Sequence, residues 1–240
     1  MGLENITIES KGARKRRFDD ACGLAHGLDL VGERWALNIL RELLLGPRRF
    51  SDLRAALPGL SANVLTQRLT ELEERHIVER LRLPPPANVQ VYGLTEWGRE
   101  IEPMVLAMAK WAYRSPGHDR MLPLSGVAML LSLKINLDAA AAGDLALTLG
   151  FDIAGTPYRG QLQAGRLSIE AGAASAPDLA YRGTARGLAA RFYGKAPLAD
   201  LEAAGVLSLS GDRDLEARLV TLFALPRRYE PMQKGSTPAA

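Results

Sequence analysis

Residues 61–75 read SANVLTQRLTELEER. Turned at about 100° per residue, this stretch places Leu65, Leu69 and Leu72 within about 40° of one another on one face of a helix. Ser61 is in position to cap the helix. The other face carries amides and hydroxyls, the groups that read base edges in a major groove: Asn63, Gln67 and Thr70 with Glu74, and Thr66 at the edge. The alternative is an ordinary surface helix, which usually carries Lys and Glu there.

The residues on either side of this helix complete a pattern. A helix is expected at residues 33–45, ended by a Gly-Pro pair, and a short one at 52–57, capped by Ser51. After residue 75, two strands at 77–83 and 89–94 flank a proline-rich loop. Thr95 then caps a long helix that ends near residue 115. Helix, turn, helix and hairpin is the order of a winged helix-turn-helix, whose second helix enters a major groove.

The composition sets outer limits on the protein. The chain has 240 residues, 47% of them hydrophobic and 24% charged, with a net charge of +3. This excludes collagen-like, disordered and disulfide-scaffold classes, and the charge alone predicts no partner. The longest apolar stretch, residues 121–133, is shorter than the ~20 residues of a membrane-spanning helix, and no secretory signal is visible. We therefore expect a cytoplasmic protein without membrane contact.

The pattern of hydrophobic residues changes in the second half. Residues 145–153 alternate strictly between apolar and other residues, which predicts a half-buried strand. Strands at 158–163 and 166–170 follow, joined by a turn at Ala164-Gly165, with further strands at 177–181 and 206–210. Helices are expected at 184–193 and 197–204, and a last one after a capping Asp212. The fold class is thus multidomain, a mainly helical winged unit followed by an α+β unit.

The first half also resembles a family. Cys22-Gly23-Leu24-Ala25, Ile39-Leu40-Arg41-Glu42-Leu43, Leu65-Thr66-Gln67-Arg68-Leu69 and Tyr92-Gly93-Leu94-Thr95 look like HxlR-type transcriptional regulators, over about residues 20–115. The resemblance implies a homodimer that binds a roughly palindromic operator in double-stranded DNA. It places the dimer interface at about residues 22–31 and 96–113, the recognition helix at 61–75 and the wing at 80–92.

The wing departs from the family in one respect, since residues 84–91 carry no charge although many relatives have Lys or Arg near the tip. Phosphate contacts are therefore expected from other cations. The candidates are Arg48, Arg49, Arg54, Arg68, Arg80, Arg82 and a basic arm that contains Lys11, Arg14, Lys15, Arg16 and Arg17. A solvated tail is the alternative for the arm.

Cys22, the only cysteine, lies where some relatives carry a redox sensor. The alternative, which we favour on sequence grounds, is a buried small hydrophobic residue, because only the distant basic arm supplies cations to stabilise a thiolate. The three histidines show no ligand spacing, so we expect no metal and no other cofactor.

The second half shows no nucleotide-binding loop and no nucleophile motif, so no enzyme is expected. Residues 203–212 and 184–188 resemble sterol-carrier-protein-like domains. That resemblance implies a cavity for a hydrophobic small molecule, with an ordinary dry core as the alternative. The expected lining residues are Leu188, Phe192, Leu198, Leu201, Leu219 and Phe223.

These observations divide the chain into five segments. We expect a flexible basic arm (1–18), a winged-helix DNA-binding and dimerisation domain (19–116), a linker or connecting helix (117–137), a sterol-carrier-like α+β domain (138–228) and a disordered tail (229–240). The leading function is a dimeric, sequence-specific transcriptional regulator, modulated by a hydrophobic ligand. The alternative is a carrier of hydrophobic ligands whose first half serves mainly for dimerisation.

Overall fold

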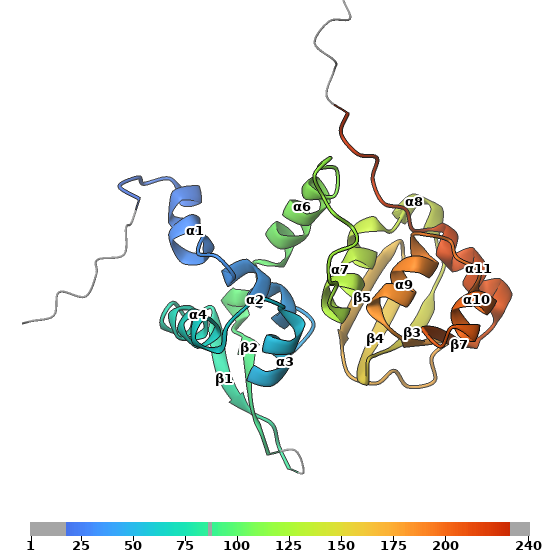
Figure 1. Cartoon of the computed structure of the whole chain (residues 1–240), viewed down its shortest axis with the longest axis horizontal. Helices are drawn as coiled ribbons and strands as arrows, with labels where there is room; N and C mark the ends of the chain where they lie inside the picture. The colour runs from blue at the N-terminus through green and yellow to red at the C-terminus, as the bar shows by residue number, and fades with distance from the viewer. Residues whose placement is uncertain (1–17, 86–87, 231–240) are drawn as a thin grey trace, which may run out of the picture.

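The computed structural model describes residues 18–85 and 88–230. Two units lie side by side, the first drawn in blue to green and the second in yellow to red (Figure 1). Within the described residues, no helix combines the length and the apolar character needed to cross a bilayer.

The first unit is a winged helix-turn-helix. Its core is formed by apolar side chains of three helices, among them Ile39, Leu53 and Leu65, all fully buried. The two strands pair antiparallel, Val78 opposite Leu94, and form the wing. The elements are α1 (Gly23–Val31), α2 (Ala36–Leu43), α3 (Phe50–Ala56), α4 (Ala62–Glu74), β1 (Val78–Arg82), β2 (Gln90–Leu94), α5 (Glu96–Arg99) and α6 (Glu102–Ala112).

Three local expectations for this unit were wrong. Helix α2 begins at Ala36 rather than residue 33, because Trp35 adopts a left-handed conformation (φ 79°). Ser51 lies inside α3, after the cap position at Arg49, and does not cap it. The long helix after Thr95 is two helices, because Pro103 has no N–H for the carbonyl four residues earlier and its ring clashes with that turn.

The second unit is an α+β layer with a five-stranded sheet. The strand order is β5-β4-β3-β6-β7, antiparallel except for the parallel pair β3 and β6. The turn between β4 and β5 has positive φ at both Ala164 and Gly165, which suits a two-residue hairpin. The elements are α7 (Gly126–Asn136), α8 (Ala139–Ala142), β3 (Leu147–Ile153), β4 (Thr156–Gln163), β5 (Arg166–Ala171), β6 (Leu179–Gly183), α9 (Ala185–Phe192), α10 (Leu198–Ala203), β7 (Leu207–Gly211) and α11 (Arg213–Thr221).

Helix α7 lies in the segment that we expected to be a connection. Its Val127, Met129 and Leu130 are buried in the same core as the sheet, so α7 is an integral part of the second unit. Near the end of the described chain, the Tyr229 N–H donates to the Arg114 carbonyl at 2.7 Å, just after α6 of the first unit.

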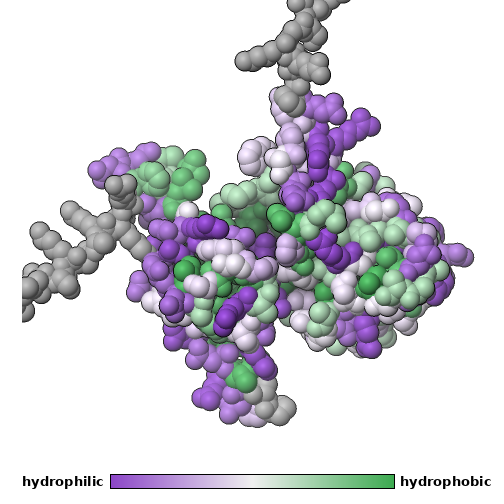
Figure 2. Space-filling model, viewed as in Figure 1, coloured by the Kyte–Doolittle hydropathy of each residue, from purple (hydrophilic) through white to green (hydrophobic). Residues whose placement is uncertain are grey.

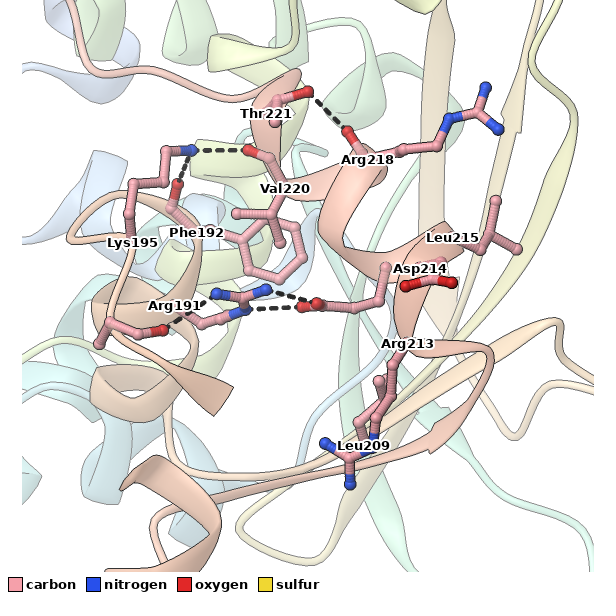
Figure 3. Close-up of polar contacts among 12 residues, drawn as sticks. Arg191, Phe192, Lys195, Leu209, Arg213, Asp214, Leu215, Arg218, Val220 and Thr221 are labelled. Atoms are coloured by element: carbon pink, nitrogen blue, oxygen red, sulfur yellow. Dashed lines mark hydrogen bonds and ion pairs between the residues drawn. The ribbon is translucent and has the colours of Figure 1, made fainter. Parts of the chain in front are cut away.

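Helices α9 and α11 are tied together by charged side chains (Figure 3). Arg191 binds both oxygens of Glu216, at 2.8 and 2.6 Å, and Glu216 is 1% exposed. The Lys195 ammonium donates to the carbonyls of Phe192, Val220 and Phe223 at 2.6 to 2.8 Å. These bonds satisfy carbonyls that the helix ends leave without partners.

The two units meet at a buried carboxylate. Glu42 on α2 is 0% exposed and accepts hydrogen bonds from Arg41, from Arg48 and, at 2.6 Å, from the Ser125 hydroxyl at the start of α7. The N–H of Ala171 on β5 also donates to the Leu45 carbonyl at 2.6 Å. The second unit is therefore joined to the helix that supports α4.

Candidate nucleic-acid interface

Helix α4 presents a polar face to solvent. Ser61 caps its start by accepting a hydrogen bond from the Val64 N–H at 3.3 Å. Leu65, Leu69 and Leu72 face the core at no more than 1% exposure. The opposite face is open at each position that the sequence singles out: Ser61, Asn63, Thr66, Gln67 and Thr70 are all exposed. Amides and hydroxyls are thus presented from the second helix of the motif.

The Gln67 side chain is held in place by a carboxylate of the same helix. The Gln67 amide donates to Glu71 at 3.1 Å, and Glu71 is 7% exposed. The Thr66 hydroxyl instead donates back to the Ala62 carbonyl at 3.0 Å. The sequence reasoning missed Glu71, although a Gln and a Glu four residues apart on a helix are neighbours.

Arg68 is not placed as a free phosphate-binding cation. Its guanidinium pairs with Glu71 and, at 3.2 Å, with Glu33, and its side chain is only 12% exposed. Arg48 is likewise bound, to Glu42 at 3.0 Å, with its side chain 15% exposed. Both arginines lie beside buried carboxylates, where the attraction between opposite charges is strong, and their phosphate contacts stay a prediction.

Other cations of the first unit remain available. Arg49, Arg54 and Arg82 are exposed, and none has a polar side-chain partner within the described residues. Arg80 is half exposed, pairs with Glu73 at 2.8 Å and lies over the Tyr92 ring at 5.6 Å. Arg16 and Arg17, with the rest of the basic arm, lie outside the described residues.

Cys22 contradicts our preferred expectation, because it is exposed rather than buried. It occupies the cap position of α1. The backbone N–H groups of Leu24 and then Ala25 lower the pKa of its thiol. The expectation from the sequence considered only nearby cations and overlooked the start of the helix, although helix N-termini also stabilise thiolates.

Helices α1 and α6 expose large apolar side chains. Leu24 is 72% and Trp111 77% exposed, and Figure 2 shows hydrophobic atoms gathered over α1. The same helices border a groove of about 290 Å³ between Gly27 and Met104. The exposed large apolar side chains of α1, α5 and α6 are Leu24, Leu28, Trp97, Met104, Met108 and Trp111. An exposed apolar patch of this kind marks an association surface.

The six residues expected to line a ligand pocket pack against one another in the core of the second unit. Leu188, Leu219 and the others are at most 9% exposed. The rings of Phe192 and Phe223 meet edge to face at 5.1 Å. These six residues thus belong to the buried core of the second unit, and their role in lining a pocket stays a prediction.

Comparisons with known proteins concern the first unit. Residues 30–119 match a family model described as HxlR-like helix-turn-helix. An uncharacterised HTH-type transcriptional regulator of Synechocystis sp. is 44% identical over 90 residues, which cover 37% of this chain and 66% of that protein. The uncharacterised regulator YvaP of Bacillus subtilis is 41% identical over 86 residues, covering 35% of this chain and 79% of YvaP.

Part of this chain is also similar to solved structures. The reduced form of the transcriptional regulator YodB from B. subtilis is 34% identical, covers 41% of this chain and 98% of its own, and has a TM-score of 0.36.

Proposed function

This chain belongs to the HxlR-like helix-turn-helix family of transcriptional regulators, not to a class of enzymes, and from that premise we propose that it binds operator DNA as a homodimer. Helix α4 of each protomer enters a major groove, and Asn63, Thr66, Gln67 and Thr70 contact base edges. The observation that carries the proposal is the exposed polar face of α4, which is set opposite a fully buried leucine face.

The cations divide into two groups in this proposal. Arg49, Arg54, Arg80 and Arg82, with the basic arm that includes Arg16 and Arg17, contact phosphates and supply affinity without reading sequence. Arg68 instead supports α4 from within the fold through its carboxylate partners. Footprinting on the intergenic DNA beside the gene tests this arrangement. We expect two protected half-sites about one helical turn, or a multiple of it, apart; a uniform pattern without half-sites would contradict it.

We propose that the homodimer forms through α1 and α6, whose large apolar side chains are exposed to solvent in the described protomer. Leu24→Asp and Trp111→Asp place a charge on this surface and should convert the dimer to a monomer in light-scattering mass measurements. Met121→Asp, at a residue that is 75% exposed outside both helices, is the matched control and should stay dimeric. A wild-type monomer at micromolar concentration would refute the dimer.

A redox response is a second candidate, favoured by the exposed Cys22 thiol at the start of α1. Two thiols of a dimer can be oxidised to one disulfide while diamide is reduced to its hydrazine. Oxidation at the proposed dimer surface would then release the operator. Operator release under diamide should occur in the wild type and disappear in Cys22→Ser; release that persists in Cys22→Ser excludes the thiol as the sensor.

For the second unit we propose the role of a ligand-responsive module, on the strength of its α+β architecture. A sterol-carrier-like identity for residues 138–228 stays a proposal. The six residues expected to line a pocket are buried in the core of this unit, so a cavity with open access lies elsewhere in the described chain.

A further inference from the structure

A cavity of about 400 Å³ lies where the two units meet, a volume within the range of small-molecule sites. One wall is the inner face of α6, the second is α7 and the third is Ala189 on α9. Figure 1 places α6 between the two units, beside α7. Most of the lining is apolar, including Leu106, Ala109 and Ile135.

The cavity also carries polar and charged groups. Tyr113, His118, Ser132, Tyr193, Arg41, Asp119 and Arg120 all line it. The Ser132 and Tyr193 hydroxyls lie 2.8 Å apart, and the Tyr113 and His118 rings are 5.6 Å apart. Convergent polar groups in an otherwise apolar cavity are the usual arrangement of a specific ligand site.

Two of these groups have unused hydrogen-bonding capacity in the described part of the chain. The buried Nδ1 atom of His118 has no partner. Arg41 binds Glu42 through Nε and Nη2 at 3.0 and 2.7 Å, which leaves Nη1 unpaired. Burial raises the pKa of the Tyr113 hydroxyl, whereas the Arg41 charge and a hydrogen bond with Ser132 lower it, and the net rise keeps this hydroxyl protonated at neutral pH.

We propose that this junction cavity binds a small aromatic carboxylate, its ring between α6 and α7 and its carboxylate at Arg41, Tyr113 and His118. A guanidinium and a phenol are donors suited to a carboxylate, and the apolar walls accept an aromatic ring. The site needs residues from both units, so the second unit completes it.

The regulatory consequence rests on the proposed operator binding. Helix α6 presents Leu106 and Ala109 to the cavity, and its other face exposes Met104, Met108 and Trp111 at the proposed dimer surface. A ligand that binds two arrangements of α6 with different affinity changes the spacing of the two α4 helices and with it the operator affinity.

Calorimetry on the full-length protein tests the binding, with 2-naphthoate as the probe. We expect saturable binding. Ala109→Phe fills the cavity and should abolish it, whereas Ala199→Phe, the same change at an exposed residue of α10, should leave it intact. Tyr113→Phe removes only a hydroxyl and should weaken 2-naphthoate about tenfold while 2-ethylnaphthalene, which has no carboxylate, binds unchanged.

Either of two results would overturn the site: no saturable binding of 2-naphthoate, or equal binding by the wild type and Ala109→Phe. If Ala109→Phe does not fold, the split between the two probes in Tyr113→Phe decides alone. These measurements contain no DNA, so they are independent of operator binding. Operator affinity with and without 2-naphthoate then tests the regulatory step, and an unchanged affinity would contradict it.

Discussion

Two arginines of the winged unit, Arg68 and Arg82, have the same charge and opposite surroundings. Arg68 is bound by two carboxylates, whereas Arg82 is exposed at the end of β1. Each phosphate contact contributes about 0.9 to the slope of log affinity against log salt. We therefore expect Arg82→Ala to weaken operator and scrambled DNA equally and to lower that slope by about 0.9 per protomer. Arg166→Ala, an exposed change on β5, is the control, and an equal slope in both variants would remove Arg82 from the DNA contacts.

The reactivity of Cys22 is a second property of a single residue. Because the N–H groups of Leu24 and Ala25 lower the pKa of the thiol, its thiolate is present at lower pH than that of a free cysteine. The rate of alkylation by iodoacetamide should therefore rise with pH to a midpoint below that of a free thiol. A midpoint at or above the free-thiol value would show that α1 does not stabilise the thiolate.

At the scale of elements, the second unit should be sensitive to the loss of one member of the buried pair between α9 and α11. Glu216→Ala leaves Arg191 without its carboxylate partner, and losing one member of a buried pair costs about 3–5 kcal/mol. We expect urea unfolding to show a loss of this size. Arg213→Ala breaks an exposed pair with Glu202 and should cost about 0–1 kcal/mol. Similar losses in the two variants would contradict this role of Glu216.

Most elements could be predicted from the sequence, because hydrophobic period and caps are local signals. Ser61 and Asp212 cap the helices that were expected, and Thr95 caps α5, the first part of the expected long helix. The misses have local physical causes too. Pro103 divides a stretch whose hydrophobic period predicts one continuous helix. At residue 35 the backbone is left-handed, but the residue is Trp rather than the glycine that usually signals this conformation.

At the scale of the whole molecule, Glu42 links the units. Glu42→Gln removes the charge that Arg41 and Arg48 bind and weakens the bond to Ser125. Breaking such a buried arrangement should cost about 3–5 kcal/mol, measured by urea unfolding. Glu170→Gln, at an exposed pair with Arg159, is the control and should change stability by about 0–1 kcal/mol. An equally small loss in Glu42→Gln would mean that this junction contributes little.

The arrangement of the two units could not be predicted from the sequence. Periodicity places Glu42 on a helix, but the contact with Ser125 joins residues 83 positions apart, and no local pattern encodes it. For the same reason the sequence predicts Arg68 and Arg48 as free cations: their carboxylate partners Glu33 and Glu42 come close only in the folded chain. The polar face of α4 could be predicted from the sequence, because helical geometry alone determines which residues share a face.

The central claim is that the polar face of α4 reads DNA sequence, and the ratio of affinities for operator and scrambled duplexes tests it most directly. In a variant with Asn63, Thr66, Gln67 and Thr70 all changed to Ala, each lost base contact should remove about 1–3 kcal/mol of discrimination. Since all four side chains are exposed, the fold should persist. We predict that the ratio falls at least about tenfold while affinity for scrambled DNA changes little; a ratio equal to that of the wild type would contradict the claim.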